Sequence, residues 1–428
     1  MKIELSDIES VEKNPLELFY EGLKSPATKD RYTRILNHTL CVVFEKVLTG
    51  TFEERASELV KNSKINPEWA MNLLLTYSKK LKERTNLPKT DKEYLNPSSF
   101  GNFFKPLKKL FDMNGVPVVW KRVYATYPEL NNQNSGRGYT RDEIQKFLEF
   151  AKGPIDKAII LVASSSGIRE GGMNLKWENV LPVYKVDDKL LLEITESQVP
   201  KAKVVCGILQ IYDGTPEYYP AFITPECYRA LMNWKTTWEI EIGRPIRPVD
   251  PIFIKEEKGR DGESKRPSKI PIMLKPTAIK QRVTRLLVES GYRIPLQKGK
   301  RRHEVPTMNG FRRFHNKTSK ETVSEDSALG SLIKKEYMMG HTGLVKLDRN
   351  YFQTHVLELV EEYLNVVPHL TISNEERNKI VIKNLKTEKD KALEESEDIR
   401  HQFSHRIRKQ NRRIEELERK LDELEKKR

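Results

Sequence analysis

The sequence predicts a mainly α-helical protein with a small antiparallel β-sheet and a long charged helix at its C-terminus. Three observations support this fold class. Apolar residues recur every three or four positions along much of the 428-residue chain, as they do on amphipathic helices. Two segments, 190–199 and 202–212, alternate in polarity or are rich in β-branched residues, as strands are. From about Glu375 the chain is almost continuously charged and contains no Pro or Gly.

Residues 1–135 are expected to form a helical domain. Its first helix starts at a Ser or Thr cap near Ser25 to Thr28 and carries an apolar stripe made of Tyr32, Ile35, Leu36, Leu40, Val43 and Phe44. A second helix begins with Asn66 as the cap and Pro67 at the first helical position. A third covers 98–115, where lysines interrupt the apolar residues. Lysines displayed between aromatic anchors indicate a clamp on a DNA backbone, and a solvated basic face is the alternative.

Residues 136–372 are expected to form a second domain, because the polar, Gly-containing stretch 131–138 is typical of a linker. Thr140 and Glu143 have the spacing of a capping box, which starts a helix. The segment from Ile155 to Ser164 is predicted to be helical, with a break at Gly167. The two strand segments are predicted to be neighbours joined by a turn at Pro200 and Lys201. Further helices are expected at 224–242, at 274–291 and around 311–318.

Residues 373–428 are expected to be a helical tail. Leu393, Ile407, Ile414 and Leu421 fall seven or fourteen residues apart, and Phe403, Leu417 and Leu424 fill the complementary heptad positions. Arg400 and Gln410 interrupt the pattern. The tail is therefore predicted to be a coiled coil that adds a dimerisation or partner contact. A single solvated helix held by charge pairs four residues apart is the alternative.

Composition favours a polyanionic partner and disfavours several classes of protein. The chain holds 76 Lys and Arg against 61 Asp and Glu, a net charge of +15, with a pI near 9.4, which suits nucleic acid. No apolar run approaches the ~18 residues of a membrane span, and the N-terminus lacks a signal-peptide pattern. Three scattered cysteines and eight histidines without a tight ligand pair argue against a disulfide framework or a metal site. No phosphate-binding glycine motif occurs, so no nucleotide or other cofactor is expected. The basic charge and the lack of a membrane span or signal peptide lead us to expect a cytoplasmic protein, associated with the nucleoid in a prokaryotic or viral context.

Five candidate site elements occur in order along the second domain. They are Arg169 in SGIR, Lys201 or Lys203 near the predicted turn, Arg312 in GFRRF, His341 in MMGHTG, and Tyr351 ten residues later. Each has an ordinary alternative taken singly: a surface ion pair, a packed surface helix or a core tyrosine. Arginine gives bidentate contacts to phosphate, and a tyrosine is an attacking group only if its hydroxyl loses a proton.

This succession resembles the tyrosine recombinase (phage-type integrase) family. In that family the same order appears as an arginine box, a hairpin lysine, a His-x-x-Arg box, a Leu-Gly-His box and a nucleophilic tyrosine. The resemblance covers roughly residues 139–364, and TKDRYTRIL at 28–36 is similar to the family's core-binding domain. It implies a helical core-binding domain and a catalytic domain that close around duplex DNA as a C-shaped clamp.

The resemblance also implies a role for each residue. Arg169 and Arg312 hold the scissile phosphate, and Tyr351 attacks phosphorus to form a 3′-phosphotyrosyl link. Lys201 or Lys203 protonates the 5′ leaving oxygen, and His341 bonds the phosphate or assists proton transfer. The implied function is site-specific recombination or integration of DNA, as in mobile genetic elements, by a dimer on each site and a tetramer in the synapse.

The chain departs from the family pattern at two positions. Asn309 stands where the family has the His of His-x-x-Arg, and an amide donates a hydrogen bond but does not shuttle a proton. Gly172 stands where the family often has an acidic residue. Two other functions therefore remain open: a non-catalytic DNA-binding or architectural protein on the same fold, and a strand-relaxing enzyme like a type IB topoisomerase.

Overall fold

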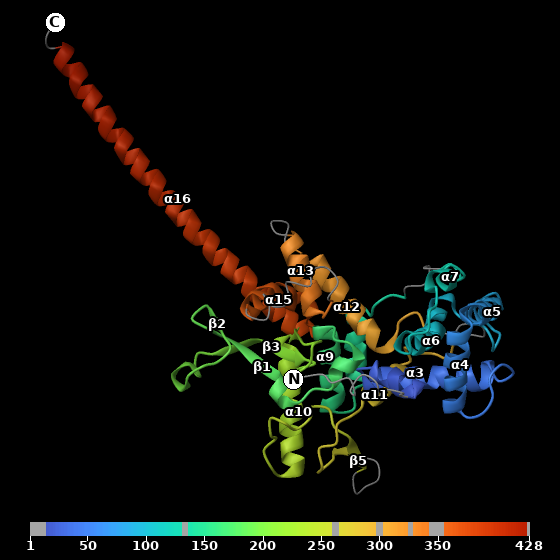
Figure 1. Cartoon of the computed structure of the whole chain (residues 1–428). Helices are drawn as coiled ribbons and strands as arrows, with labels where there is room; N and C mark the ends of the chain where they lie inside the picture. Colours follow the sequence, from blue (N-terminus) through green and yellow to red (C-terminus); the bar gives the residue numbers. More distant parts are fainter. Residues whose placement is uncertain are drawn as a thin grey trace, which may run out of the picture. The chain divides into compact units, whose positions relative to one another are not determined.

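The structure is a computed structural model that describes residues 14–130, 136–258, 265–296, 303–323, 328–341 and 355–425. Two compact units are present, one within residues 1–135 and 296–302, the other within 136–295 and 303–428. The predicted fold class is confirmed: helices dominate, and the main sheet is small and antiparallel (Figure 1).

The first unit is helical throughout its described secondary structure. Its elements are α2 (Pro15–Glu21), α3 (Pro26–His38), a π-helical turn η1 (Thr39–Val43), α4 (Phe52–Ile65), α5 (Pro67–Thr85), η2 (Pro97–Ser99), α6 (Gly101–Met113) and α7 (Trp120–Tyr124). Asn66 caps α5 as predicted, because its side chain accepts from the Trp69 N–H at 3.0 Å. The apolar stripe of α6 joins the buried core through Phe104, Leu107 and Leu110.

The apolar stripe predicted for the first helix wrongly includes Val43. Leu36, Leu40 and Phe44 are buried, but Val43 is exposed. The cause is η1, because a π-helical turn holds one more residue than an α-helical turn and rotates the following side chains around the axis.

The second unit places helices around one small sheet. Its helices are α8 (Arg141–Glu149), α9 (Pro154–Ser166), α10 (Pro225–Ile242), α11 (Pro276–Glu289), α12 (Thr307–Glu321), α13 (Ala328–Met338), α15 (Val356–Leu370) and α16 (Asn374–Glu425). The short 3₁₀ turns are η3 (Glu170–Met173), η4 (Trp177–Asn179) and η5 (Glu196–Gln198). The main sheet holds β1 (Val180–Val186), β2 (Lys189–Leu191), β3 (Lys203–Ile211) and β4 (Tyr219–Ile223), and a separate hairpin holds β5 (Glu256–Lys258) and β6 (Lys265–Pro267).

The predicted pairing of segments 190–199 and 202–212 is wrong. The strand order is β2-β1-β3-β4, so β1 lies between the two predicted neighbours. The tight turn is Asp187-Asp188, whose positive φ angles of 44° and 65° suit a two-residue hairpin, and not Pro200-Lys201. Strand β1 was not predicted because it contains Pro182, and proline is unusual inside a strand. Pro182 is tolerated because β2 pairs only with Tyr184–Val186, so the β2 side of β1 has no partner strand at Pro182.

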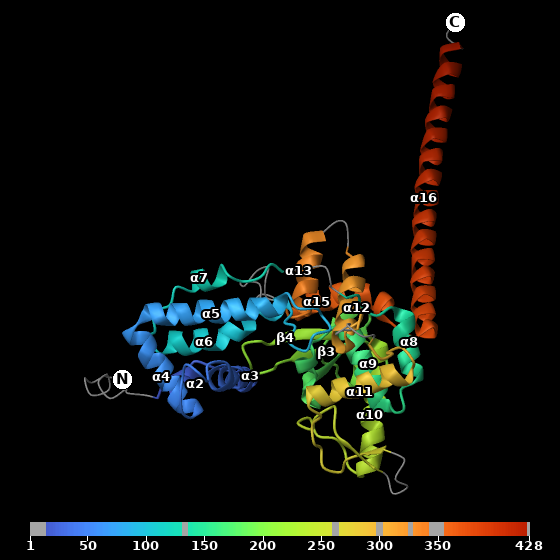
Figure 2. The same cartoon turned by 90° about the vertical axis from the view of Figure 1, so that its right-hand side faces the viewer.

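Helix α9 forms the centre of the second unit. It packs against α8, α10, α11 and α12, which surround it in both views (Figures 1 and 2). Its apolar run from Ala158 to Ala163 is buried, and the hydroxyls of Ser165 and Ser166 donate to backbone carbonyls one turn earlier, at 2.6 and 2.5 Å. The helix ends as predicted at Gly167, which has a left-handed φ of 59°.

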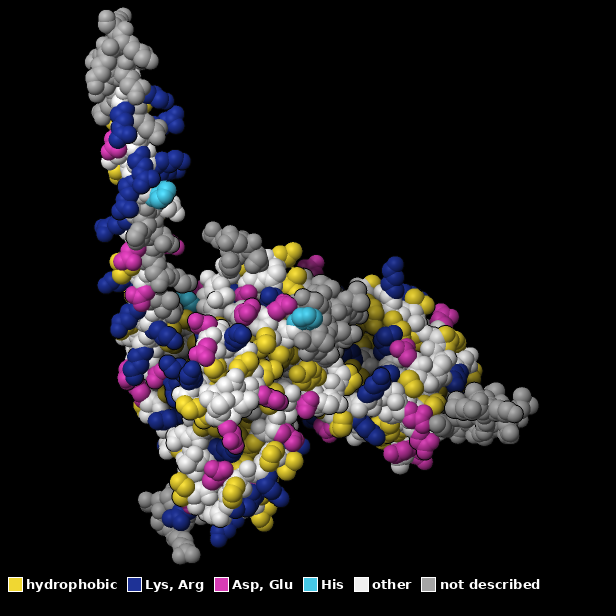
Figure 3. Space-filling model, turned by 90° about the vertical axis from the view of Figure 1, so that its left-hand side faces the viewer, with side chains coloured by type: hydrophobic (Ala, Val, Ile, Leu, Met, Phe, Trp, Pro, Cys, Tyr) yellow, Lys and Arg dark blue, Asp and Glu magenta, His cyan; other side chains and the backbone are white. Residues whose placement is uncertain are grey.

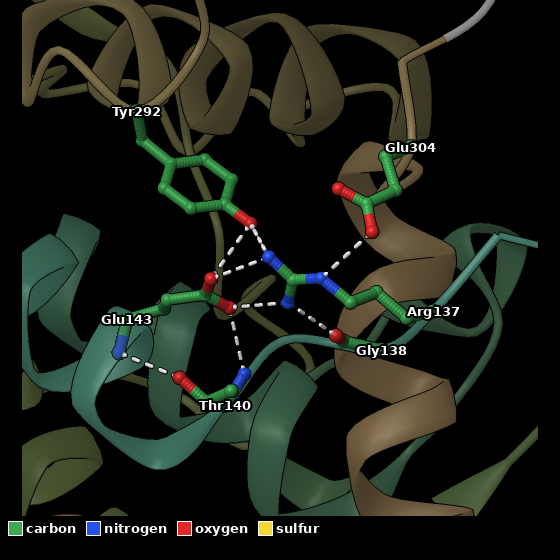
Figure 4. A network of polar contacts seen from close by, with 6 residues as sticks. All are labelled: Arg137, Gly138, Thr140, Glu143, Tyr292 and Glu304. Atoms are coloured by element: carbon green, nitrogen blue, oxygen red, sulfur yellow. Dashed lines mark hydrogen bonds and ion pairs between the residues drawn. The ribbon is translucent and has the colours of Figure 1, made fainter.

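Arg137 ties the start of α8 to the rest of the second unit (Figure 4). The predicted capping box is confirmed: Glu143 accepts from the Thr140 N–H and donates its own N–H to the Thr140 hydroxyl. Arg137 donates two bonds to the Glu143 carboxylate, at 2.7 and 2.9 Å, and one each to Tyr292 and Glu304. One guanidinium therefore joins the linker, α8, the end of α11 and the approach to α12.

Helix α16 begins on the second unit and continues with exposed side chains. The Glu226 carboxylate of α10 accepts the backbone N–H groups of Ile372 and Ser373, and Arg229 pairs with Glu376 at 2.7 Å. The expected tail is thus helical, whereas its pairing is not tested. Among the helices that the structure describes, none combines the length and apolar character that crossing a membrane needs.

Candidate active site

Arg312 lies almost buried on α12, with 7% of its surface exposed. Phe311, Phe314 and His315 are buried on the same helix and hold it in the core. The guanidinium donates to the carbonyl of Gly167 at 2.6 Å and to that of Met339 at 2.7 Å. Arg312 therefore joins the end of α9 to the chain that follows α13.

The turn after α13 brings a second arginine to the same place. Gly340 has a left-handed φ of 64°, and a Cβ on it would lie 2.5 Å from the Tyr219 ring, so only glycine fits. Arg169 follows the Gly167 break and donates to the Gly340 carbonyl at 3.2 Å. The two predicted arginines, 143 positions apart in the sequence, thus bond to adjacent carbonyls, those of Met339 and Gly340.

His341 joins this cluster through both ring nitrogens. Its Nε2 lies 2.7 Å from Nη2 of Arg312, and its Nδ1 lies 2.5 Å from a carboxylate oxygen of Glu336. An arginine can only donate, so Nε2 is the acceptor and the proton is on Nδ1, bonded to Glu336. Glu336 also pairs with Lys320 at 2.6 Å.

The pKa values in the cluster agree with this arrangement. Burial lowers the pKa of His341, and the charges of Arg312 and Arg169 lower it further against the opposing effect of Glu336. Burial alone would raise the pKa of Glu336, but the hydrogen bonds from Lys320 and His341 outweigh it and lower the pKa. A neutral imidazole therefore lies between a cation and an anion.

The cluster has an excess of positive charge where an anion would be stabilised. Burial lowers the pKa of Arg312, and the nearby charge of Arg169 lowers it further. Within the described residues, Arg312 donates to two carbonyls and one neutral imidazole and also interacts with the Tyr219 hydroxyl, and no carboxylate bonds to it directly. A buried guanidinium without a carboxylate, beside a second guanidinium, is the setting in which a phosphate binds well.

His315 lies behind the cluster. It is 4% exposed and packs on Gly167, where an added Cβ would lie 2.8 Å from its ring. Burial lowers its pKa to about 4, with a further effect of the Arg312 charge, so the ring is neutral near pH 7. His315 therefore supports the α9 end of the cluster.

The other predicted residues are placed less closely. Asn309 is exposed on α12, three residues before Arg312. Lys203 is exposed at the start of β3, and Lys201 is exposed before it, 3.9 Å from Asp187 at the β1–β2 turn. No hydrogen bond or ion pair within the described ranges connects either lysine to the arginine cluster. Tyr351 lies outside the described residues.

Three residues of the cluster were not predicted from the sequence. Glu336 and Lys320 reach it from α13 and α12, and Tyr219 from β4. Only Glu336 has a sequence signal, because a glycine that ends a helix folds the next residue back over the last turn. The backbone N–H of His341 bonds the Glu336 carbonyl in this way at 3.0 Å.

The described part of the chain contains no group of three or more His, Cys, Asp or Glu residues placed to hold a metal ion. The chemistry available in the cluster is that of guanidinium and imidazole groups: binding an anion and fixing its orientation.

Comparisons with known proteins give remote structural similarities. No protein-family model matches the chain, and no curated protein matches it. Among solved structures, the XerH site-specific recombinase bound to a palindromic difH substrate is 14% identical with a TM-score of 0.40, over 84% of this chain and 98% of that one. The Tn1549 transposon integrase in complex with circular intermediate DNA is 14% identical with a TM-score of 0.40, over 82% and 99%. The XerA recombinase is 11% identical with a TM-score of 0.31.

Proposed function

We propose that this protein is a site-specific recombinase or integrase that cuts and rejoins DNA strands through a phosphotyrosyl intermediate. One observation carries the proposal: Arg312 is buried without a bonded carboxylate and lies beside Arg169. Both arginines bond to the segment 339–340, which precedes Tyr351 in the sequence. A DNA phosphodiester supplies the missing negative charge, and two guanidinium groups match its oxygens.

The proposed reaction needs both cations and the tyrosine. A tyrosine hydroxyl has a pKa near 10, so it must give its proton to water as it attacks phosphorus. The phosphorus–Tyr351 bond forms while the bond to the 5′ oxygen breaks, and that oxygen takes a proton from Lys201 or Lys203. Arg169 and Arg312 stabilise the charge that develops on the phosphate oxygens. Attack by another strand's 5′ hydroxyl reverses these steps, so neither ATP nor a metal is consumed.

His341 is assigned a positioning role in the DNA-free protein. Both of its ring nitrogens are engaged, with Arg312 and with Glu336. It therefore holds the Arg312 guanidinium in place. Contact of His341 with the phosphate would first require exchange of one of these bonds.

The proposed organisation follows the expected domains. Residues 1–135 bind the DNA backbone, residues 136–372 carry the reaction, and residues 373–428 mediate assembly. Two protomers act on each site and four exchange strands between paired sites.

The test is covalent trapping on nicked duplexes. When the nick lets the cleaved end diffuse away, the phosphotyrosyl adduct accumulates and survives denaturing electrophoresis. We expect an adduct from a library of such duplexes, its loss in Tyr351→Phe, and a loss of ~100-fold or more in Arg312→Ala. Arg285→Ala, which changes an exposed arginine of the same unit, serves as the control and should keep full activity.

Two other outcomes would reject the proposal. Binding to duplex DNA without any adduct across the library supports a non-catalytic architectural protein, consistent with Asn309 in place of histidine. An adduct accompanied only by relaxation of supercoils, with no recombinant product, supports a topoisomerase.

A further inference from the structure

Helix α16 carries an exposed apolar seam. From Phe403 onward, apolar side chains follow one another at alternating spacings of four and three residues, interrupted only by Gln410. Phe403, Ile407, Ile414 and Leu417 are between 52% and 60% exposed. In the sequence, Leu421 and Leu424 continue the series. Such spacing places these apolar side chains along one side of the helix. Their exposure to water is unfavourable.

The seam has a definite beginning. The heptad positions labelled a and d face the partner helix in a coiled coil. When Ile407 and Ile414 are assigned to position a, the a position one heptad earlier is Arg400, and the d position before it is Ser396. A cation at a would face its own copy across a paired helix. Pairing is therefore confined to residues 403–424, a length of about 33 Å at 1.5 Å per residue.

We propose that residues 403–424 of α16 form a parallel two-stranded coiled coil with the same segment of a second copy of this chain. Isoleucine at two a positions, with leucine at d in Leu417 and Leu424, is the pattern that favours two strands. Gln410 at d would face its counterpart and hydrogen-bond to it, which fixes the register.

The charges beside the seam select the parallel orientation. The g positions are all cationic: Arg406, Arg413 and Lys420. Glu418 and Glu425 occupy e positions. In a parallel pair, g of one helix meets the following e of the other, so Arg413 meets Glu418 and Lys420 meets Glu425. An antiparallel pair would set the cationic g positions against each other, which is unfavourable.

The remaining cations do not oppose this pairing. Arg408, Lys409 and Arg412 are exposed and occupy the heptad positions b, c and f, which lie outside the a and d seam. They stay in water when two helices pair. Figure 3 shows Lys and Arg side chains gathered along the exposed helix. No contact with DNA is required, so the proposal stands apart from the catalytic one.

The first experiment is sedimentation of the full chain without DNA over a range of concentrations. We expect a reversible monomer–dimer equilibrium. Ile414→Glu should raise the dimer dissociation constant by ~100-fold or more, because each of the two paired helices would then bury a carboxylate in the apolar interface. The matched control is Gln402→Glu, which adds the same charge at an exposed c position and should change the constant by about twofold or less. Because Ile414 is exposed in the single chain, the variant should melt like the parent protein.

The second experiment determines orientation by disulfide trapping. In a Cys41→Ser background, the remaining native cysteines, Cys206 and Cys227, are buried. Ile407→Cys at a and Leu417→Cys at d are made separately and treated with a thiol oxidant. A parallel, in-register pair crosslinks at both positions, because a faces a and d faces d. In an antiparallel pair a faces d, so a pair that aligns 407 with 417 crosslinks only when both changes are in one chain, and that result overturns the proposed orientation.

Three further outcomes overturn the proposal as a whole. They are a chain that stays monomeric at every concentration, a dimer that Ile414→Glu leaves intact, and a monomer whose seam instead binds anionic vesicles.

Discussion

At the scale of single residues, Arg312 gives the clearest prediction. Phosphate should stabilise the protein by filling the site beside Arg312 and Arg169. At several times its dissociation constant we expect a rise in melting temperature of about 2–4 °C, compared with sodium chloride at equal ionic strength. Arg169 is exposed, so Arg169→Ala should keep the fold and lose most of this rise. The control Arg285→Ala should keep it, and an equal rise in both variants would place phosphate elsewhere.

Glu336 is predicted to set the tautomer of His341. In the parent protein, nitrogen-15 spectra of labelled histidine should show a neutral ring with its proton on Nδ1. Glu336→Ala removes the acceptor, so part of the population should move the proton to Nε2, where it opposes Arg312. Glu321→Ala removes an exposed carboxylate of α12 and is the control. An unchanged His341 signal in Glu336→Ala would show that the carboxylate does not determine the tautomer.

At the scale of elements, two helix ends form a matched pair. Gly167 ends α9 and Gly243 ends α10, with φ angles of 59° and 67°. Gly243→Ala has open space for its Cβ and should cost only the left-handed strain, about 1–2 kcal/mol. Gly167→Ala also presses on His315 and should cost a further ~1–3 kcal/mol. Denaturant unfolding measures both. Equal losses would mean that His315 moves aside freely.

The Arg137 network predicts a pH dependence of stability. Burial alone would raise the pKa of Glu143, but hydrogen bonds from Arg137, Thr140 and Tyr292 outweigh it and lower the pKa. A carboxylate with a lowered folded-state pKa stabilises above its unfolded pKa, near 4.5, and loses this effect as pH falls through the folded value. Glu143→Gln should therefore cost about 1–2 kcal/mol at pH 7 and progressively less below pH 4.5.

The control for this network is Lys152→Ala, since Lys152 pairs with Glu289 on the surface and is 71% exposed. Its effect on the free energy of unfolding should stay below about 0.5 kcal/mol at both pH values. If the loss of unfolding free energy in Glu143→Gln does not depend on pH, the packing of the Glu143 side chain, and not its negative charge, stabilises the start of α8.

Local signals predicted the elements that depend on local chemistry. The caps at Asn66 and Thr140 and the break at Gly167 are correct because each is fixed by a side chain or a φ angle within a few residues. Strand order depends on contacts between distant residues. Alternating polarity identified β3, but Pro182 concealed β1, and no local signal showed that β1 separates β2 from β3.

At the scale of the whole molecule, the sequence predicted that certain distant residues lie together better than it predicted how they contact one another. The resemblance named Arg169, Arg312 and His341, and the structure brings these three together. It did not indicate that both guanidiniums bond the carbonyls before His341, because that contact joins α9, α12 and α13 through their packing. The roles of these three residues, and those of Lys201, Lys203, Asn309 and Tyr351, stay predictions.

The distribution of charge gives the last prediction, on how the molecule holds DNA. Residues 387–428 contain thirteen Lys and Arg and twelve Asp and Glu, so removing them changes the net charge of +15 by only one. If residues 1–386 alone hold the DNA backbone, a chain ending at Lys386 should bind a short duplex with an unchanged slope of log affinity against log salt. Six cations lie between Ile399 and Ile414 without an intervening Asp or Glu. Were they DNA contacts, the slope would fall by about 5, since each phosphate contact contributes about 0.9. Fluorescence anisotropy with the duplex in excess, so that protomers bind singly, separates the two cases.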